Sequence, residues 1–120
     1  MTNASAREIV ESYRAALGKG DFVSARNLMQ DNMVFEGPIE TFNKADDYLE
    51  SSKRLASIIQ RIDLKKMFVD GDDVCVLYEM VTNTPAGTAF IAEWYQVKGG
   101  KIAFIRAVFD ARPFAAMFGG

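Results

Sequence analysis

A change in the spacing of apolar residues near residue 60 constrains this chain more than any other feature. Before that point apolar residues recur every three or four positions, and after it they alternate with their neighbours. The first spacing is typical of amphipathic helices and the second of β-strands. The sequence therefore predicts helices followed by an antiparallel sheet, which is an α+β domain.

Three helices are predicted in the first half. Ser5-Ala6-Arg7-Glu8 fits the S-x-x-E capping box, and Gly18 is a natural stop, so a helix is predicted between them. Asp21 can cap a short second helix, and Asn43 can cap a third. Between the second and third helices, Met33-Val34-Phe35 predicts a brief strand that ends at a glycine and a proline.

Four strands are predicted in the second half, and turn signals rich in glycine or proline separate them. Their ranges are 62–69, 74–82, 88–97 and 102–109. Strands that follow one another through short turns predict an antiparallel meander, one face of which the helices should cover.

Length and composition limit the classes of protein. The 120 residues predict one domain over 1–120, and the net charge of −2 provides no basic surface for nucleic acid. No stretch approaches the ~20 apolar residues of a membrane span, and the first residues lack a signal peptide's apolar core. The single Cys75 cannot form an internal disulfide, so a cytoplasmic location is expected.

The chain contains no histidine. This removes the commonest general base and the commonest metal ligand together. No metal and no cofactor are expected, and any proton transfer must fall to Asp, Glu, Tyr, Lys or Cys.

The strands carry large apolar residues on both faces. On the face predicted to be concave, Tyr78 and Met80 lie beside Phe90 and Trp94 of the next strand. Glu79, Glu93 and Arg106 are assigned to the outer face, where charges can pair across strands. The outer apolar residues predict a homodimer through that face, since such an area is an aggregation risk in water. They are Leu77, Val81, Ile91, Tyr95, Phe104 and Val108.

The order of elements resembles the nuclear transport factor 2-like superfamily, in its SnoaL-like and ketosteroid-isomerase-like branch. The resemblance rests on "YRAALGKGDFVSARNLM", "VFEGPIETFNKADDYL", "GDDVCVLYEMV" and "EWYQVKGGKIAFIRAVFD". It implies a cone, in which a curved antiparallel sheet with a mixed edge wraps around three N-terminal helices. It also implies a blind apolar pocket that opens toward the helical end.

The pocket is expected to bind a small apolar molecule, although the same residues could simply form the core. The tail, with Phe114, Met117 and Phe118, is expected to fold over the cone as a lid. The residues predicted to line the pocket are Phe22, Met29, Phe35, Tyr78, Met80, Phe90, Trp94, Ile105, Phe109, Phe114 and Met117.

The resemblance to ketosteroid isomerase places three chemical positions. Tyr13 matches the tyrosine on the first helix that binds the developing enolate oxygen. Gly37, before Pro38, stands where that family has its general-base aspartate, and Ala92 stands where it has an acidic hydrogen-bond donor. Two of the three groups are missing, so isomerase activity on steroids is not expected, and Glu36-Gly37-Pro38 is interpreted as a strand end and turn.

Tyr13 and Asp110 are the residues expected to carry catalysis, if there is any. Tyr13 is either a hydrogen-bond donor to a ligand oxygen or a core aromatic. Asp110 is either an acid or base at the pocket mouth, as in SnoaL-like cyclases, or a turn cap paired with Arg112. Strict alternation places Asp110 on the outer face, so the catalytic role requires a β-bulge.

Three functions remain open from the sequence. The first is binding of a small apolar molecule. The second is an isomerase, cyclase or dehydratase that acts on such a molecule without a cofactor. The third is a dimeric protein-association module. The aromatic concave face favours the first two, and the missing base and acid weaken the second.

Overall fold

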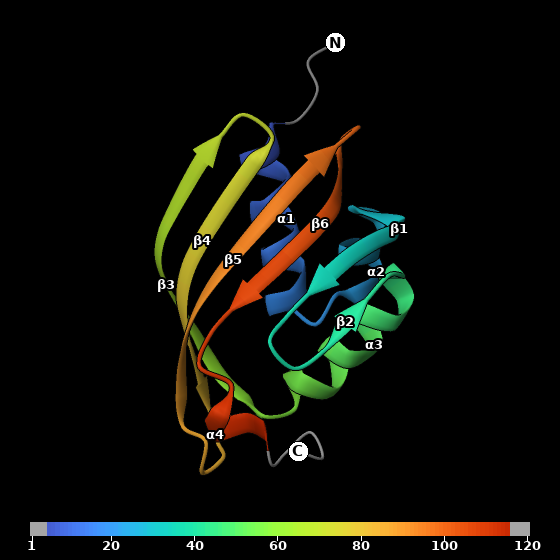
Figure 1. The fold of residues 1–120 in the computed structure, drawn as a ribbon. Helices are drawn as coiled ribbons and strands as arrows, with labels where there is room; N and C mark the ends of the chain where they lie inside the picture. The colour runs from blue at the N-terminus through green and yellow to red at the C-terminus, as the bar shows by residue number, and fades with distance from the viewer. Residues whose placement is uncertain (1–4, 116–120) are drawn as a thin grey trace.

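The computed structural model of the protein describes residues 5–115, which form a curved, open sheet with helices on its concave side (Figure 1). Six strands run in the order β2-β1-β6-β5-β4-β3, and every neighbouring pair is antiparallel except β1 and β6. The strands are β1 (Met29–Glu36), β2 (Thr41–Phe42), β3 (Ile59–Asp70), β4 (Asp73–Thr82), β5 (Thr88–Lys98) and β6 (Lys101–Val108). The helices are α1 (Ala6–Gly18), α2 (Phe22–Asn27), α3 (Ala45–Ala56) and α4 (Arg112–Ala115). The predicted α+β fold with a mixed edge is confirmed.

Local capping explains where the first two helices begin. The Ser5 side chain accepts a hydrogen bond from the Glu8 N–H at 3.2 Å, and Asp21 accepts one from the Ser24 N–H at 3.0 Å. The predicted cap at Asn43 is wrong, because the N-cap of α3 is Lys44, which has no side-chain hydrogen bond there.

The first strand is longer than its apolar residues predicted. β1 begins at Met29, next to Ile102 of the parallel strand β6. The sequence pattern predicted only Met33-Val34-Phe35, because the polar Gln30, Asp31 and Asn32 before them do not look like part of an apolar strand. Pairing with a distant strand, rather than local pattern, therefore extends β1.

The helices cover the concave side of the sheet. In Figure 1, α1 crosses behind β4, β5 and β6, while α2 and α3 lie behind β1 and β2. Ile9, Val10 and Tyr13 of α1 are buried, as are Val76 of β4 and Ile105 of β6. The core is thus a single apolar layer between helices and sheet. No helix within residues 5–115 is both long enough and apolar enough to cross a membrane.

The face assignment of β5 is corrected by the structure. In the antiparallel register Tyr78 lies opposite Ile91, and Val76 opposite Glu93, so these residues share the buried face. Phe90 and Trp94 were predicted on the concave face, but they lie on the outer face and are 57% and 41% exposed. Glu93, Ile91 and Tyr95 were assigned to the outer face and are buried instead.

The outer face remains partly apolar after this correction. Leu77, Val81 and Phe104 of the predicted set are half-buried, and Val108 is exposed. Trp94 packs edge-to-face on Phe104, with ring centroids 5.3 Å apart. Its indole N–H also donates to Asp73 at 2.8 Å, which fixes the ring against the sheet.

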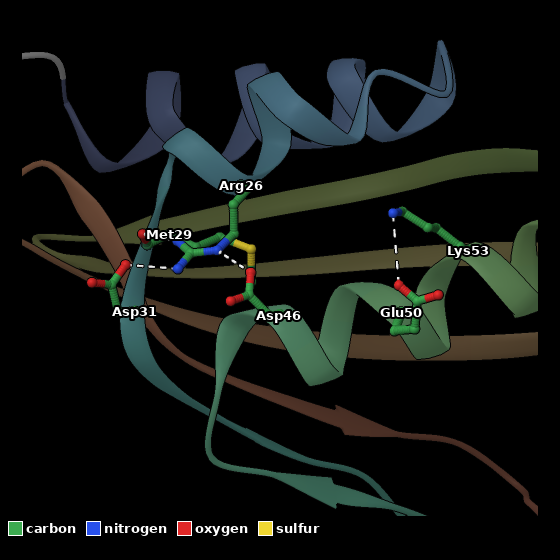
Figure 2. A network of polar contacts seen from close by, with 6 residues as sticks. All are labelled: Arg26, Met29, Asp31, Asp46, Glu50 and Lys53. Carbon is green, nitrogen blue, oxygen red and sulfur yellow. Dashed lines mark hydrogen bonds and ion pairs between the residues drawn. The ribbon is translucent and has the colours of Figure 1, made fainter.

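Arg26 holds three elements together at the edge of the helical layer (Figure 2). Its Nε donates to Asp46 of α3 at 2.8 Å, and its Nη2 donates to Asp31 of β1 at 2.6 Å. Its Nη1 donates to the Met29 carbonyl at 3.3 Å. Both carboxylates are largely exposed, so each ion pair stabilises the fold only modestly. One planar guanidinium nevertheless fixes the position of α2 against β1 and α3.

The described part of the tail folds back on the open end of the sheet. Phe114 of α4 is 2% exposed and meets Phe109 edge-to-face, with centroids 6.0 Å apart. Met117 and Phe118, which were also predicted to close the cone, lie outside the described residues.

Replacing Phe114 with alanine is expected to lower the free energy of unfolding by about 3 kcal/mol, because a buried ring is lost and a cavity is left. Chemical denaturation followed by circular dichroism measures the change. Phe68→Ala is the matched control, since that ring is 53% exposed and should cost far less. Equal losses in the two variants would show that α4 does not pack as described.

Candidate functional site

Two cavities adjoin each other on the concave side of the sheet. The larger, of about 820 Å³, lies among the end of α1, the start of α2, α3 and strands β3 to β5. The smaller, of about 110 Å³, lies among the turn after β1, α3, and the chain that joins β6 to α4. Six residues line both cavities, so they form a common wall: Tyr48, Ser52, Leu55, Tyr78, Met80 and Glu93.

A buried carboxylate is the chemical centre of this wall. Glu93 Oε2 accepts a hydrogen bond from Tyr78 Oη at 2.8 Å. Glu93 Oε1 accepts one from Arg14 Nη1 at 3.1 Å and another from the Tyr95 hydroxyl. Arg14 Nη1 also donates to Tyr95 Oη at 3.1 Å, and its guanidinium lies 4.4 Å from the centre of the Tyr78 ring. Three donors from three elements thus meet on one carboxylate.

The alternation of β5 brings these groups together. Glu93 and Tyr95 are two residues apart, so both side chains point to the concave side. Tyr78 reaches the carboxylate from the neighbouring β4, and Arg14 reaches it from α1, which crosses that face. A buried charge is tolerated in a protein when it is paired and hydrogen-bonded, as Glu93 is.

The environment keeps the tyrosines neutral and Arg14 charged. Burial raises the pKa of Tyr78 and of Tyr95 well above the usual value, and the nearby Glu93 carboxylate adds to the effect. Burial opposes the charge on Arg14, yet Tyr95 and Glu93 beside it raise its pKa above the ordinary value. The tyrosines therefore act as hydrogen-bond donors across the physiological range, and Arg14 balances the charge of Glu93.

Tyr13 has a polar group without a partner. Its ring is 1% exposed and packs edge-to-face on Tyr95, with centroids 6.1 Å apart. Within residues 5–115, its hydroxyl is the one buried side-chain oxygen or nitrogen that makes no hydrogen bond. Burial raises the pKa of Tyr13 well above the usual value, and the nearby Tyr48 is the second-largest cause of this rise. The hydroxyl therefore stays protonated. Tyr13 lines the larger cavity.

The predicted pocket residues divide into four groups. Tyr78 and Met80 line both cavities, Phe22 lines the larger, and Phe35, Phe109 and Phe114 line the smaller. Met29 and Ile105 are fully buried core residues and line neither cavity, while Phe90 and Trp94 lie on the outer face. Met117 lies outside the described residues.

Asp110 lies away from both cavities and pairs with Arg112, which is the second of the two roles considered from the sequence. Its carboxylate accepts hydrogen bonds from the Arg112 backbone N–H at 3.1 Å, from Nε at 2.9 Å and from Nη2 at 2.8 Å. The hydrogen bonds from Arg112 hold the pKa of this exposed carboxyl at about 2. No bulge turns Asp110 inward, so it caps the turn after β6.

Gly37, at the predicted base position, is required by close packing. A Cβ built there would lie 2.9 Å from Cε1 of the Phe35 ring. That ring stacks on Tyr48, with centroids 4.5 Å apart and planes at 23°. An aromatic ring therefore occupies the space beside the position at which the resemblance implied a base.

Sequence reasoning missed Glu93, Arg14, Tyr95 and Tyr48. Ala92 was matched to the acidic donor position, but the neighbouring Glu93 is the residue that points inward. A signal was present in "IAEWYQV", where one charge interrupts an apolar strand and shares its face with a tyrosine. Arg14, next to Tyr13 on the inner side of α1, could have supplied its counter-charge.

Solved structures with the same fold cover nearly the whole chain. A nuclear transport factor 2-like protein of unknown function from Cytophaga hutchinsonii superposes with a TM-score of 0.82 at 25% identity, over 94% of this chain and 96% of that one. A proposed polyketide cyclase from Sinorhizobium meliloti has a TM-score of 0.76 at 18% identity, over 83% and 93%. A de novo designed protein with a curved β-sheet has a TM-score of 0.81 at 21% identity, over 99% and 98%.

The likeness to a designed protein shows that this fold does not by itself specify a function. No protein of curated function matches the chain by sequence. The family model of the SnoaL-like domain matches residues 10–105, which is most of the chain and includes most of α1 and of the sheet. The match also covers Glu93 and its partners Arg14, Tyr78 and Tyr95, here called the Glu93 cluster. The predicted resemblance is confirmed, and the chain belongs to the SnoaL-like domain family within the nuclear transport factor 2-like fold.

Proposed function

We propose that this domain binds a small, uncharged and largely apolar molecule in the larger cavity, through an oxygen that accepts a hydrogen bond from Tyr13. The observation that carries the proposal is the Tyr13 hydroxyl, which is buried, protonated and without a partner, and which lines that cavity. An unpaired buried donor costs free energy, and a ligand oxygen would supply the missing acceptor.

The size and walls of the cavity fit such a ligand. A volume of about 820 Å³ is within the range of about 300–1,000 Å³ that small-molecule sites occupy. Phe22, Leu17 and Met80 supply apolar wall, and the buried polar groups are those of Tyr13 and the Glu93 cluster. The exposed Lys19, Gln60 and Arg61 line the rim. An apolar enclosure with a few convergent polar groups is the usual form of a small-molecule site.

The electrostatics favour an uncharged ligand. Arg14 and Glu93 form an ion pair at 3.1 Å and cancel each other's charge. Lys19 and Arg61 also line the cavity, but both are exposed side chains at its rim. A charged group buried beside Arg14 and Glu93 would therefore lack a partner and would disturb their ion pair.

Catalysis is the second candidate function, and Glu93 is the observation that favours it. This carboxylate lines both cavities, and only one hydrogen bond is made to Oε2, so that atom has room for one more donor. Three donors already hydrogen-bond to this carboxylate, so few accepting positions remain for a substrate. Binding is therefore the function that the geometry supports better.

The proposed polyketide cyclase is only 18% identical to this chain, so the two are shown to share a fold and nothing more. An isomerase, cyclase or dehydratase reaction would use groups that line the cavities, such as Glu93 and Tyr13, and not Asp110, which lies outside them.

Binding can be tested with a dimethylaminonaphthalene that carries an acetyl group, whose fluorescence reports an apolar site. Gly18 lines the larger cavity, and a Cβ there meets nothing within 4 Å. Gly18→Leu should fold normally and weaken binding of the probe at least fivefold, because the side chain fills the cavity mouth. Val23→Leu on exposed α2 is the matched control. Binding that is unaffected by Gly18→Leu would refute the proposed site.

Tyr13→Phe separates hydrogen bonding from packing. The ring is retained and an unsatisfied hydroxyl is removed, so thermal stability should stay the same or rise slightly. Affinity for the acetyl probe should fall about fivefold, the value of one net hydrogen bond. A dimethylaminonaphthalene without the acetyl group should bind both proteins equally. If the acetyl probe also binds both equally, Tyr13 does not contact the ligand oxygen.

We also propose that the outer face forms a homodimer, with the corrected residues in the contact. Phe90, Trp94 and Val108 are exposed there, next to the half-buried Leu77 and Phe104. Large exposed apolar side chains on one face typically mark an interaction surface.

Sedimentation at micromolar concentration is expected to show a dimer for the wild-type chain and a monomer for Val108→Glu, because a buried unpaired charge opposes association. Val23→Glu, at an exposed position on α2, should leave the dimer intact. A wild-type monomer at this concentration would be inconsistent with the proposed interface.

A further inference from the structure

We propose that the smaller cavity is a compartment that selects the ligand by the length of a short apolar group attached next to its hydrogen-bonding oxygen. The body of the ligand occupies the larger cavity, and the short group crosses the common wall. This inference rests on the proposed function and extends it to the class of ligand, an oxygen-bearing molecule with a compact alkyl end.

The common wall places the polar contact between the two compartments. Tyr78, Tyr48 and Glu93 line both cavities, whereas Tyr13 lines only the larger. Tyr48 is also among the close neighbours that raise the pKa of Tyr13. A ligand oxygen that accepts from Tyr13 therefore lies near the common wall, and the inference requires that a group attached to the same carbon point across that wall.

The volume of the smaller cavity limits that group. A cavity of about 150 Å³ lined by apolar side chains can hold benzene. The smaller cavity has about 110 Å³, so it fits a group somewhat smaller than a benzene ring, such as a chain of three or four carbons.

The walls of the smaller cavity are suited to an alkyl group. Phe35, Ile91 and Ala107 present apolar surface, and Phe109 and Phe114 close the end toward α4. Glu40 is the charged residue outside the common wall that lines this cavity, and its Oε2 accepts a hydrogen bond from Ser51 Oγ at 2.9 Å. An ionised end group would therefore lose its hydration and find few partners, whereas an alkyl group needs no hydrogen-bond partner there.

Close packing makes the length limit sharp. The Phe35 ring stacks on Tyr48, with centroids 4.5 Å apart. On its other side the ring lies so close to Gly37 that even a Cβ there would be only 2.9 Å from Cε1. Phe114 is fixed against Phe109 at the other end. A longer chain must displace these packed rings or pass out into solvent beside the exposed Pro38, and neither outcome continues the gain from burying each carbon.

The test uses dimethylaminonaphthalenes with an acetyl, propanoyl, butanoyl, hexanoyl or octanoyl group. Affinity for the wild-type protein should rise about fourfold for each CH₂ from acetyl to butanoyl, the usual gain on burying a methylene. It should then fall for hexanoyl and octanoyl. Affinity that continues to rise to octanoyl, or that does not depend on chain length, would overturn the proposal.

Two alanines give a matched pair of variants. Ala107 lines only the smaller cavity, and Ala56 lines only the larger. Ala107→Val should abolish the gain from acetyl to butanoyl, because the added methyl groups occupy the space that the longer chain would fill. Ala56→Val should preserve that gain. A gain that survives Ala107→Val would refute the small compartment as the place of the chain.

A third variant guards against a folding artefact in Ala107→Val. Ile91 lines only the smaller cavity, and Ile91→Ala enlarges it, so the best chain should become longer by about two carbons. An unchanged optimum in a folded Ile91→Ala protein would contradict the inference. If the acetyl probe binds and responds to Gly18→Leu while chain length has no effect, this inference alone fails. If no probe binds, the proposed function fails and the inference with it.

Discussion

The buried Glu93 carboxylate is the constraint on which the rest of the site depends. An ionised group in a protein interior must be paired, and each partner of Glu93 comes from a different place in the fold. Arg14 fixes α1 against the sheet, Tyr78 ties in β4, and Tyr95 secures β5 itself. Loss of any one partner would leave the carboxylate under-satisfied, so the three elements are held in one arrangement. The cavities next to the cluster derive their shape from that arrangement.

The fold was predictable because its signals are local. Capping residues, a break in hydrophobic period and glycine turns indicated the helices and the meander, and the boundaries differ from the predictions by a few residues. β1 and β2 were harder to predict, since β1 is extended by a parallel partner about 70 residues further along the chain, at Ile102, and β2 has only Thr41 and Phe42. Pairing over such a distance leaves little trace in a single sequence.

The site was predicted less well, for one physical reason. Both faces of β5 carry large apolar residues, so alternation alone cannot say which face is buried. Side-chain size favoured Phe90 and Trp94 as inner residues, and charge favoured Glu93 as an outer one. Register with β4 reverses both assignments. The role of Asp110 stayed open from the sequence, because a carboxylate at a strand end can equally face a pocket or cap a turn.

The packing of Gly37 has a consequence for protein engineering. A designer who wished to give this scaffold a carboxylate at that corner could not do so with one substitution, because any side chain at 37 meets the Phe35 ring. The ring would have to be reduced at the same time, and Tyr48 would then lose its stacked neighbour. New chemistry at this corner therefore requires coordinated changes at two or three positions, and each intermediate variant would carry a packing defect.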